Sequence, residues 1–399
     1  MMAELDDLDV TFIGHPFAPI GMGEQLRSHI SACNHLHLHH GVFDIFRYAQ
    51  RSDPAHFGVV GARERQAVPP GIRIFHVNGD EVDNVIAAFE ARGNSFAAGH
   101  NVIVPAWELP SYPRVWAEKL RRFDEVWALS GFIRDSLAAA GIRAHRIGQS
   151  VETDPIAFLP RRLFGIRESS FVLLHFLDLT SYAARKNPYA VLELARLLWA
   201  EQPFLDLQLV LKVKNGEQGA EAWAAEFKGD PRLHVIDSPL DSVGVRSLVN
   251  CCDCFVSLHR SEGFGRGLGE AMALGKLALG TGWSGNLDFM TGENSLLAGY
   301  RLVRLQRDEY PHWQGQSWAE ADVAHAAALL RPVLADDSRG RALALRGQLD
   351  VLRSHGHRAV GLRILARLRE IASASPKLAT QGSTPRRSRD VPAMSDVLA

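Results

Sequence analysis

Strand-like and helix-like segments alternate along almost the whole chain, and this alternation limits its fold more than any other feature. In the first part, the run VTFIGH and residues 72–79, 101–109 and 124–130 have the apolar character of strands. Helical patterns follow the first, second and fourth of these runs, with Gly93 placed to end one helix and Ser130 placed to cap another. This order predicts a parallel sheet covered by helices.

The same order starts again after a loop near residues 151–168. Residues 171–178 form a near-continuous apolar run, as expected of a strand buried on both faces of a parallel sheet. A helical pattern follows, with Pro188 in its first turn. The runs LDLQLVLKV, LHVID, CFVSLH and KLALGT predict further strands, and residues 319–333 and 338–372 have helical patterns.

We therefore expect an α/β protein with two Rossmann-like, doubly wound parallel-sheet domains that face a central cleft. The expected domains are residues 1–150 and 151–340, and 399 residues are enough for two cores. Residues 341–372 should form a C-terminal helix that packs across both domains. Residues 373–399, rich in Ser, Pro, Thr and Ala, should be a disordered tail. The cleft is the expected ligand site.

A glycine-rich segment, LHRSEGFGRGLGEAMALGK (258–276), stands between a predicted strand and a predicted helix. Its glycines allow a ligand close to the backbone, and the helix start offers free N–H groups to an anion. Glu262 and Glu270 flank this turn. A dinucleotide-binding fingerprint would instead be G-x-G-x-x-G on the first βα turn of its domain. That turn here is GHPFAPIGMG, which makes a nicotinamide-dependent oxidoreductase a weak alternative.

The string S-E-G-F-G-x-x-x-x-E-A-M-A-x-G resembles the E-x7-E signature of the family-4 retaining glycosyltransferases, whose fold is named GT-B. The resemblance implies that Glu262 contacts hydroxyls of a donor sugar and that Glu270 contacts the ribose of its nucleotide. It also implies that the loop Gly263-Phe264-Gly265 lies against the donor. Carboxylates suit this work because they accept two hydrogen bonds from neighbouring hydroxyls.

Other segments resemble the same family in the same order, although each is also compatible with an ordinary turn. TGWSGNLDFM (281–290) resembles the next donor-side loop, with Gly285 and Asn286 near the sugar or the diphosphate. SYAARKNPYA (181–190) resembles the basic segment that grips the diphosphate, which gives this role to Arg185 and Lys186.

The resemblance extends over residues 8–372 and is less specific outside these loops. Many family members have an Arg where this chain has Thr180, and Lys214 or Arg260 could supply the missing charge. In the first domain, GHPFAPIGMGE (14–24) resembles the family's first glycine-rich loop, in which Gly21 and Gly23 would allow closure over the donor phosphates or the acceptor. The segment W-E-L-P before V-W-x-x-S resembles one subgroup of the family.

Candidate acceptor-side residues lie near predicted strand ends in the first domain. His76 and Glu108 end strands and His100 stands just before one. Any of them could orient or deprotonate an acceptor hydroxyl, and each could equally be a structural residue. His35, His37 and His39 would share one face of an extended segment, which we interpret as an exposed edge strand and not as a metal site.

Composition excludes several other classes of protein. The net charge of −1 argues against nucleic-acid binding. The N-terminal segment has no apolar core and no run approaches 18 apolar residues, so we expect neither a signal peptide nor a membrane span. Three of the four cysteines stand in CCDC, which fits a helix end before a buried strand better than a zinc site. The short basic helix 113–123 fits either a solvated face or contact with an anionic membrane.

The family resemblance implies a hexosyltransferase, which we expect in the cytoplasm, at the inner face of the membrane if residues 113–123 dock there. It would move a sugar from a nucleotide-sugar donor to a glycan or lipid-linked acceptor with retention, as in bacterial surface polysaccharide synthesis. The donor would be a substrate, and no cofactor or metal would be needed. A non-catalytic scaffold that binds nucleotide sugar or glycan is the main alternative.

Overall fold

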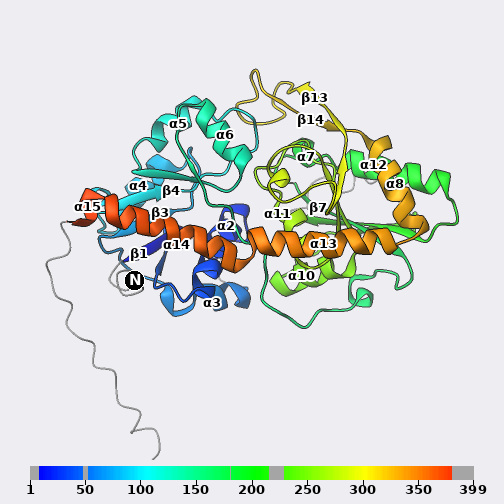
Figure 1. The fold of residues 1–399 in the computed structure, drawn as a ribbon, viewed down its shortest axis with the longest axis horizontal. Coiled ribbons are helices and arrows are strands. Elements are labelled where there is room, and N and C mark those ends of the chain that lie inside the picture. The colour runs from blue at the N-terminus through cyan, green and yellow to red at the C-terminus, as the bar shows by residue number, and fades with distance from the viewer. Residues whose placement is uncertain (1–8, 48–52, 180, 215–228, 380–399) are drawn as a thin grey trace, which may run out of the picture.

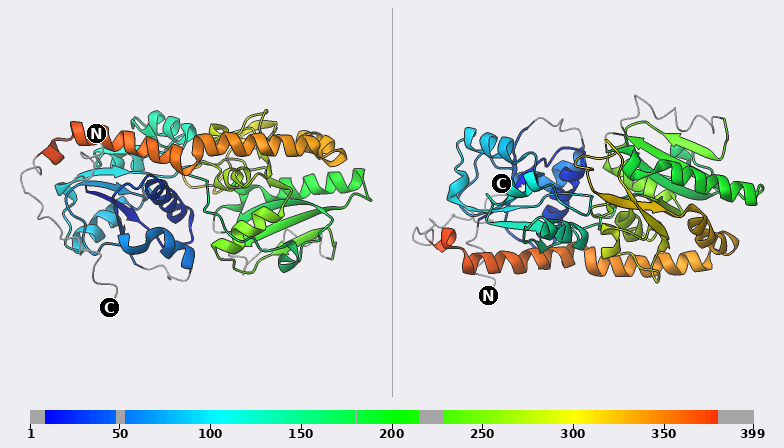
Figure 2. Two further views of the ribbon diagram at one scale, coloured as in Figure 1. Left: turned by 60° about the horizontal axis from the view of Figure 1, so that its bottom comes forward. Right: turned by 90° about the horizontal axis from the view of Figure 1, so that it is seen from above.

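Two α/β lobes lie side by side, and a pair of long helices runs along both of them (Figures 1 and 2). The structure is a computed structural model that describes residues 9–47, 53–179, 181–214 and 229–379. Each lobe contains one six-stranded sheet. Every strand pairing in these two sheets is parallel, as the repeated strand–helix order predicted.

The first sheet has the strand order β2-β1-β3-β4-β5-β6. Its strands are short and mostly buried on both faces: β1 (Val10–Gly14), β2 (Gly41–Asp44), β3 (Ile72–Phe75), β4 (His100–Ile103), β5 (Glu125–Ala128) and β6 (His145–Arg146). The helices that connect them are α2 (Gly21–His35), α3 (Pro54–Val60), α4 (Val82–Ala91), α5 (Arg114–Leu120) and α6 (Gly131–Ala139). The Ser130 side chain caps α6 by accepting from the N–H of Ile133, which confirms its predicted role.

The second sheet has the strand order β12-β11-β10-β7-β8-β9. Its strands are β7 (Phe171–Asp178), β8 (Leu207–Lys214), β9 (Leu233–Ile236), β10 (Cys254–Ser257), β11 (Leu277–Thr281) and β12 (Leu296–Ala298). On one face, α8 (Pro188–Glu201) and α12 (Val323–Ala335) complete an apolar core with the strands. The other face packs against α10 (Ser242–Cys251) and α11 (Arg266–Ala273). This burial explains the near-continuous apolar runs in the sequence.

The C-terminal helices connect the two lobes. Helix α13 (Ser338–His355) packs on α11 of the second domain, and α14 (His357–Ala374) packs on α2 of the first (Figure 1). Gly361 allows the close contact with α2, since a Cβ there would stand 2.6 Å from the Ala32 carbonyl. The predicted tail began too early, because α14 continues to Ala374 and α15 (Pro376–Ala379) follows it. Residues 380–399 lie outside the described residues.

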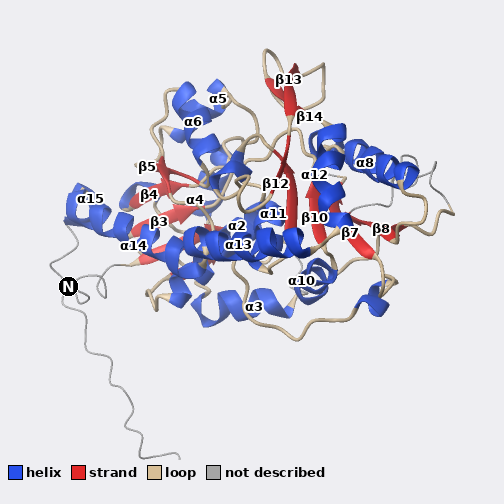
Figure 3. Ribbon diagram, turned by 45° about the vertical axis from the view of Figure 1, so that its right-hand side comes forward, coloured by secondary structure: helices blue, strands red, loops and turns tan. Residues whose placement is uncertain are grey.

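Three sequence predictions of local structure were wrong. Residues 35–40 are not an edge strand: α2 continues to His35, and His37 adopts a left-handed φ of 55°. The strand predicted for 101–109 ends at Ile103. The helix predicted from 319 begins at Val323, because β14 (Ser317–Ala321) pairs with β13 (Tyr300–Arg304) in an antiparallel hairpin (Figure 3). The third error arose because pairing with a distant segment overrides the local helical pattern.

Helices long and apolar enough to span a bilayer are absent from the part of the chain that the structure describes. All four cysteines are free and buried, with Cys251 ending α10 and Cys254 beginning β10 as the CCDC pattern suggested.

Candidate active site

Most of the predicted site residues lie at the carboxyl ends of the strands of the two sheets. In a doubly wound sheet, ligands bind where the strand order reverses direction. This point lies between β1 and β3 in the first sheet and between β7 and β10 in the second. Glu262 follows β10, whereas Arg185 and Lys186 end α7 (Ala183–Lys186), which follows β7. The fold therefore unites segments that are 76 residues apart.

A buried cluster of one carboxylate and two cations forms the centre of this site. The Lys186 ammonium donates to Glu262 Oε1, and Arg185 Nη1 lies 3.2 Å from Glu262 Oε2. Arg185 also donates to the Ser261 carbonyl at 2.9 Å and to the Ser181 hydroxyl at 2.9 Å. Both Arg185 and Glu262 are less than one-tenth exposed. This geometry holds two positive charges at the carboxyl ends of the strands of the second sheet.

The charges in this cluster stabilise one another. Burial by itself would raise the pKa of Glu262, but the ion pairs with Lys186 and Arg185 outweigh it and hold this pKa well below its usual range. Burial by itself would lower the pKa of Arg185. The carboxylates of Glu262 and Glu108 outweigh this effect and raise the pKa of Arg185 above its normal value. Glu262 is therefore a carboxylate at neutral pH and serves as an acceptor of hydrogen bonds.

The backbone on both sides of α7 is in an uncommon conformation. Tyr182 and Asn187 flank this single turn with φ values of 56° and 54°. Asn187 fits this region because its side chain donates to the Leu258 carbonyl at 3.1 Å. A bulky residue such as Tyr182 is seldom found there. Arg185 and Lys186 lie between these two bends.

Glu108 of the first domain contacts Tyr310 and Ser261 of the second domain, next to this cluster. The Tyr310 hydroxyl donates to Glu108 Oε2 at 2.5 Å, and the Ser261 hydroxyl donates to the Glu108 carbonyl. Tyr310 was not selected from the sequence. Its only signal there was an aromatic cluster, Y-P-H-W, inside a polar loop. Glu108 and Arg185 interact electrostatically, so the two domains share one charged network.

The loop Gly263-Phe264-Gly265 makes contacts that the sequence did not predict. The Ser130 hydroxyl of the first domain donates to the Gly263 carbonyl. A Cβ at Gly263 would stand 2.6 Å from the carbonyl of Trp107, also of the first domain. The Phe264 ring is buried against Phe289, with 5.1 Å between ring centroids. The Phe264 side chain therefore supports the loop from the protein interior.

Glu270 lies beside the glycine-rich loop of the first domain. It pairs with Arg266 at 2.7 Å, one turn earlier on α11, and Arg266 is 3.8 Å from Glu24 at the start of α2. Burial raises the pKa of Glu270. Gly21 begins α2 and is exposed. Gly23 is enclosed, because a Cβ there would stand 2.2 Å from the Ala18 carbonyl.

A buried polar network supports the predicted donor loop, residues 281–290, from the protein interior. The Asn286 side chain donates to the Thr281 carbonyl at 3.0 Å, and its Oδ1 lies 3.1 Å from His259 Nε2. The Gly285 N–H donates to the Glu262 carbonyl at 2.9 Å. Asn286 thus holds the loop in place through its side chain, and Gly285 connects the loop to the Glu262 segment.

The residues proposed to replace the missing arginine have other contacts. Arg260 forms an ion pair with Glu320 at 2.7 Å and donates to the Ala184 carbonyl at 2.8 Å. Lys214, at the end of β8, donates to the Pro19 carbonyl of the first domain. Lys214 therefore contacts the glycine-rich loop of the first domain, residues 14–24. Thr180 itself lies outside the described residues.

The acceptor-side candidates separate in the structure. His76 lies at the carboxyl end of β3 but is fully buried, where its Nδ1 is 3.2 Å from Gln25 Nε2. Burial lowers its pKa well below the usual value. The prediction for His100 was wrong. As the first residue of β4 it lies at the amino edge of the sheet, remote from the carboxyl-end site, because the two ends of a strand face opposite edges.

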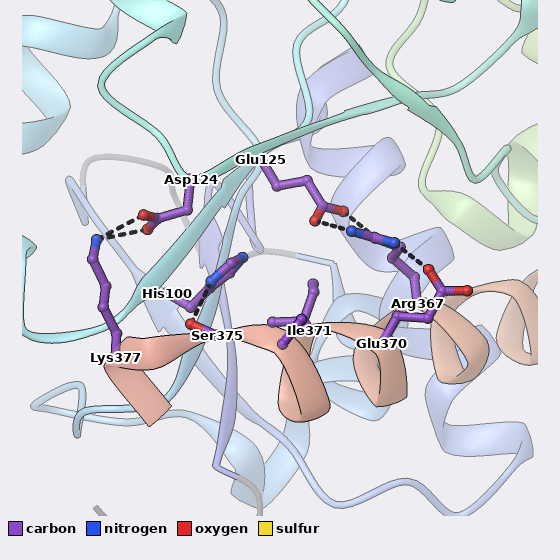
Figure 4. A pocket seen from close by; sticks show the side chains of 9 residues that line it. His100, Asp124, Glu125, Arg367, Glu370, Ile371, Ser375 and Lys377 are labelled. Atoms are coloured by element: carbon purple, nitrogen blue, oxygen red, sulfur yellow. Dashed lines mark hydrogen bonds and ion pairs between the residues drawn. The ribbon is translucent and has the colours of Figure 1, made fainter. Parts of the chain in front are cut away.

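His100 instead lines a pocket of about 520 Å³ under the C-terminal helix (Figure 4). Its Nδ1 lies 2.9 Å from the Ser375 hydroxyl. Arg367 pairs with both carboxylate oxygens of Glu125 at 2.6 Å, and Lys377 pairs with Asp124 at 2.8 Å. These contacts attach α14 and α15 to the first sheet. Among the described residues, neither this pocket nor any other place has three or more His, Cys, Asp or Glu side chains arranged so that they could hold a metal ion.

Comparison with known proteins supports the fold. No protein-family model matches the sequence, and no curated protein matches it. Solved structures do match. HepE of Anabaena, in complex with UDP and glucose, is 15% identical with a TM-score of 0.63, over 91% of this chain and 100% of its own. Sucrose-phosphate synthase of Thermosynechococcus elongatus is 14% identical with a TM-score of 0.64, over 92% and 100%. OtsA, in its apo structure, is 10% identical with a TM-score of 0.61, over 90% and 99%.

These likenesses cover both domains and confirm the expected GT-B fold. At such low identity they show the fold alone. The chemistry of the site follows from its own residues: the Arg185 and Lys186 cations, the Glu262 carboxylate that pairs with both, and the Glu108 carboxylate of the first domain, which accepts from Tyr310. Such a site can hold an anionic group and hydrogen-bond a polyhydroxylated one.

Proposed function

We propose that this protein is a retaining, family-4 glycosyltransferase that moves a hexose from a nucleotide-sugar donor to a glycan or lipid-linked acceptor. One observation carries the proposal. Glu262, Arg185 and Lys186 form a buried charged cluster where the second sheet meets the first domain. Glu262 was selected from the E-x7-E resemblance, and Arg185 and Lys186 from the resemblance of residues 181–190 to the same family. A protein of this fold, HepE, was solved with UDP and glucose.

Arg185 and Lys186 would stabilise the leaving group. When the bond between the sugar carbon and the phosphate oxygen breaks, the electron pair stays on the diphosphate. Two preorganised cations reduce the cost of that charge, and their positions are already set by α7. In this proposal they also do the work that a divalent cation does elsewhere, and activity should then persist in a chelator.

Glu262 would have two functions in turn. Without donor its carboxylate balances the two cations. With donor bound, the diphosphate would supply that negative charge, and the Glu262 oxygens would be free to accept from sugar hydroxyls. Glu270, at the edge of the α11 turn beside Arg266, is proposed to contact the ribose.

Glu108 is the proposed acceptor-side carboxylate. The acceptor oxygen forms the new bond to the sugar carbon and loses its proton in the same step. Glu108 is placed across from Glu262, and Tyr310 holds one of its oxygens. Glu108 is thus positioned to orient the acceptor hydroxyl or to take its proton.

Work on a lipid-linked acceptor, as in bacterial surface polysaccharide synthesis, would bring the protein to the cytoplasmic face of a membrane. Helix α5 is the proposed contact, since Val115 is 62% exposed among basic residues. Sedimentation with vesicles of anionic lipid tests this part separately. Vesicles that leave the protein in the supernatant at low salt would contradict it.

The central test is thermal unfolding with UDP, GDP, ADP, their common sugar conjugates and NAD. A ligand that binds only the folded protein raises the midpoint, by about 2.7 kcal/mol of stability at a hundredfold excess over Kd. We expect one nucleoside diphosphate and its sugar to shift the midpoint, and Glu270→Ala to abolish the shift. A shift with NAD alone would overturn the proposal. An activity assay in which the donor releases no nucleotide would overturn it as well.

A further inference from the structure

A second pocket lies next to the charged cluster, on the side of the β13–β14 hairpin. Its volume is about 350 Å³. It is lined by Tyr182, Asp308, Tyr310, Pro311, His312, Trp313 and Gln314. We propose that this pocket binds a sugar ring of the acceptor, so that the acceptor is a carbohydrate of at least two residues. The inference rests on the proposed function and adds the acceptor class and its subsite.

The lining has the two chemistries that a sugar ring needs. Tyr182 and Tyr310 lie with 4.8 Å between ring centroids, and Trp313 is half-buried beside them in the lining. The face of an aromatic ring is electron-rich and attracts the slightly positive C–H groups on one face of a pyranose. The exposed side chains of Asp308 and Gln314 provide acceptors and a donor for the hydroxyls at the ring edge.

The backbone around the pocket is held in an uncommon conformation. Tyr182, Asp308 and His312 have φ values of 56°, 62° and 53°. The described chain has seven non-glycine residues with positive φ, and three of them line this one pocket. Such conformations cost free energy and are found more often at ligand sites than elsewhere. A tyrosine at a left-handed φ costs free energy, and a loop with only a structural role would gain nothing from it.

The pocket is connected directly to the proposed reaction centre. Tyr310 forms its wall and also donates to Glu108 at 2.5 Å. Tyr182 stands only three residues before Arg185. A sugar in the pocket would therefore extend toward Glu108 and present its next hydroxyl near the Glu262 cluster. The pocket and the proposed reaction centre thus share Tyr310.

Contacts between the domains fix the hairpin loop above the first domain. Gln316 exchanges two hydrogen bonds with the backbone of Ser111, at 3.1 and 2.7 Å. The His312 ring lies edge-on to Trp116 at 4.9 Å. The loop between β13 and β14 thus reaches across to the W-E-L-P region, at the upper rim of the molecule in Figure 1. The residues that line the pocket all belong to the second domain, and these contacts hold their loop against the first domain.

The test uses the full chain and saturation-transfer NMR with maltose, cellobiose, lactose, mannobiose and N,N′-diacetylchitobiose as probes. The variants are Tyr182→Ala and Trp313→Ala. Tyr182→Phe keeps the ring, and Phe204→Ala removes an aromatic side chain that is fully exposed and outside both pockets. Thermal shift with the nucleoside diphosphates is measured on every variant as the check on the donor site.

We expect at least one disaccharide to bind, and its affinity to fall about tenfold in each of the two alanine variants. Tyr182→Phe and Phe204→Ala should bind as the wild type does, and the nucleotide shift should be the same in all. No binding of any probe, or equal binding by the alanine variants, would overturn the inference. So would loss of the nucleotide shift in Tyr182→Ala alone, which would assign the pocket to the nucleobase.

Failure of the proposed function would give a different pattern. In that case no nucleoside diphosphate would shift the wild-type midpoint, while disaccharide binding and its loss in Tyr182→Ala would still report on the pocket.

Discussion

The backbone N–H of Gly131 donates to both carboxylate oxygens of Asp288, at 3.1 and 2.9 Å. Gly131 begins α6 in the first domain, and Asp288 ends a short 3-10 helix (Gly285–Asp288) in the second. A carboxylate of one domain therefore caps a helix N-terminus of the other, which is a favourable place for negative charge. Ser130 binds the Gly263 carbonyl beside it. The described conformation is closed at this point.

Asp288→Ala should weaken closure of the domains. The variant removes the anion at the start of α6 and its bonds to Gly131, so we expect a loss of about 1 kcal/mol of stability and a larger radius of gyration. Thermal unfolding and small-angle scattering measure the two effects. Asp135→Ala, which changes an exposed carboxylate on the same helix, is the control. An unchanged radius would show that the other contacts are enough to hold the closed form.

Glu262→Gln should destabilise the free protein and enlarge the effect of a nucleoside diphosphate. Without the carboxylate, the buried Arg185 loses its counter-ion, at a cost of about 3 kcal/mol. A bound diphosphate would restore negative charge at that place, so the thermal shift should exceed that of the wild type while glycosyl transfer is lost. Glu201→Gln, which breaks an exposed pair with Arg331, should change neither. A shift equal to the wild type's would contradict this account of the cluster.

Alanine in place of three glycines should distinguish packing from ligand contact. A Cβ at Gly285 would stand 2.0 Å from the Gly263 carbonyl, and one at Gly23 would stand 2.2 Å from the Ala18 carbonyl. Both variants should lower the unfolding midpoint, by at least about 2 kcal/mol of stability. At Gly21 no described atom lies within 4 Å of the new Cβ. Gly21→Ala should therefore keep the wild-type midpoint.

An activity loss in Gly21→Ala with a normal midpoint would then assign Gly21 to donor contact. Full activity with a normal midpoint would refute the role that the family resemblance gave it.

Stability should fall as the pH is lowered from 6.5 toward 5, because of buried histidines. Burial lowers the pKa of His29 to about 4 and the pKa of His175 to about 4. The folded state resists protonation in this range, whereas the same side chains in the unfolded chain take up protons near their ordinary pKa. Each contributes a loss of up to about 1.4 kcal/mol per pH unit.

Urea unfolding at several pH values measures this slope. His29→Gln should reduce the slope by the amount that corresponds to about one bound proton. His39→Gln, which changes an exposed side chain, should leave the slope unchanged. An equal slope in His29→Gln would mean that other groups cause the acid sensitivity.

Much of the fold could be predicted from the sequence because strands and helices leave local periodic patterns. Strand β7 has the bounds that the apolar run 171–178 predicted, and Pro188 begins α8. The elements that were missed or misassigned depend on distant partners. The strand β14 is stable only against β13, and β2 follows a histidine-rich turn that has no strand pattern.

The sequence by itself determined which side chains are ionisable and where most of the strands and helices lie, since these features depend mainly on neighbouring residues. It identified Glu262, Glu270, Arg185 and Lys186 as candidates. Only the tertiary structure decided which of them meet. It joined Glu262 to Arg185 and Lys186, placed Tyr310 on Glu108, and put His100 at the opposite edge of the first sheet. Contacts between residues far apart in the chain depend on how whole sheets and domains pack, and no local pattern contains that information.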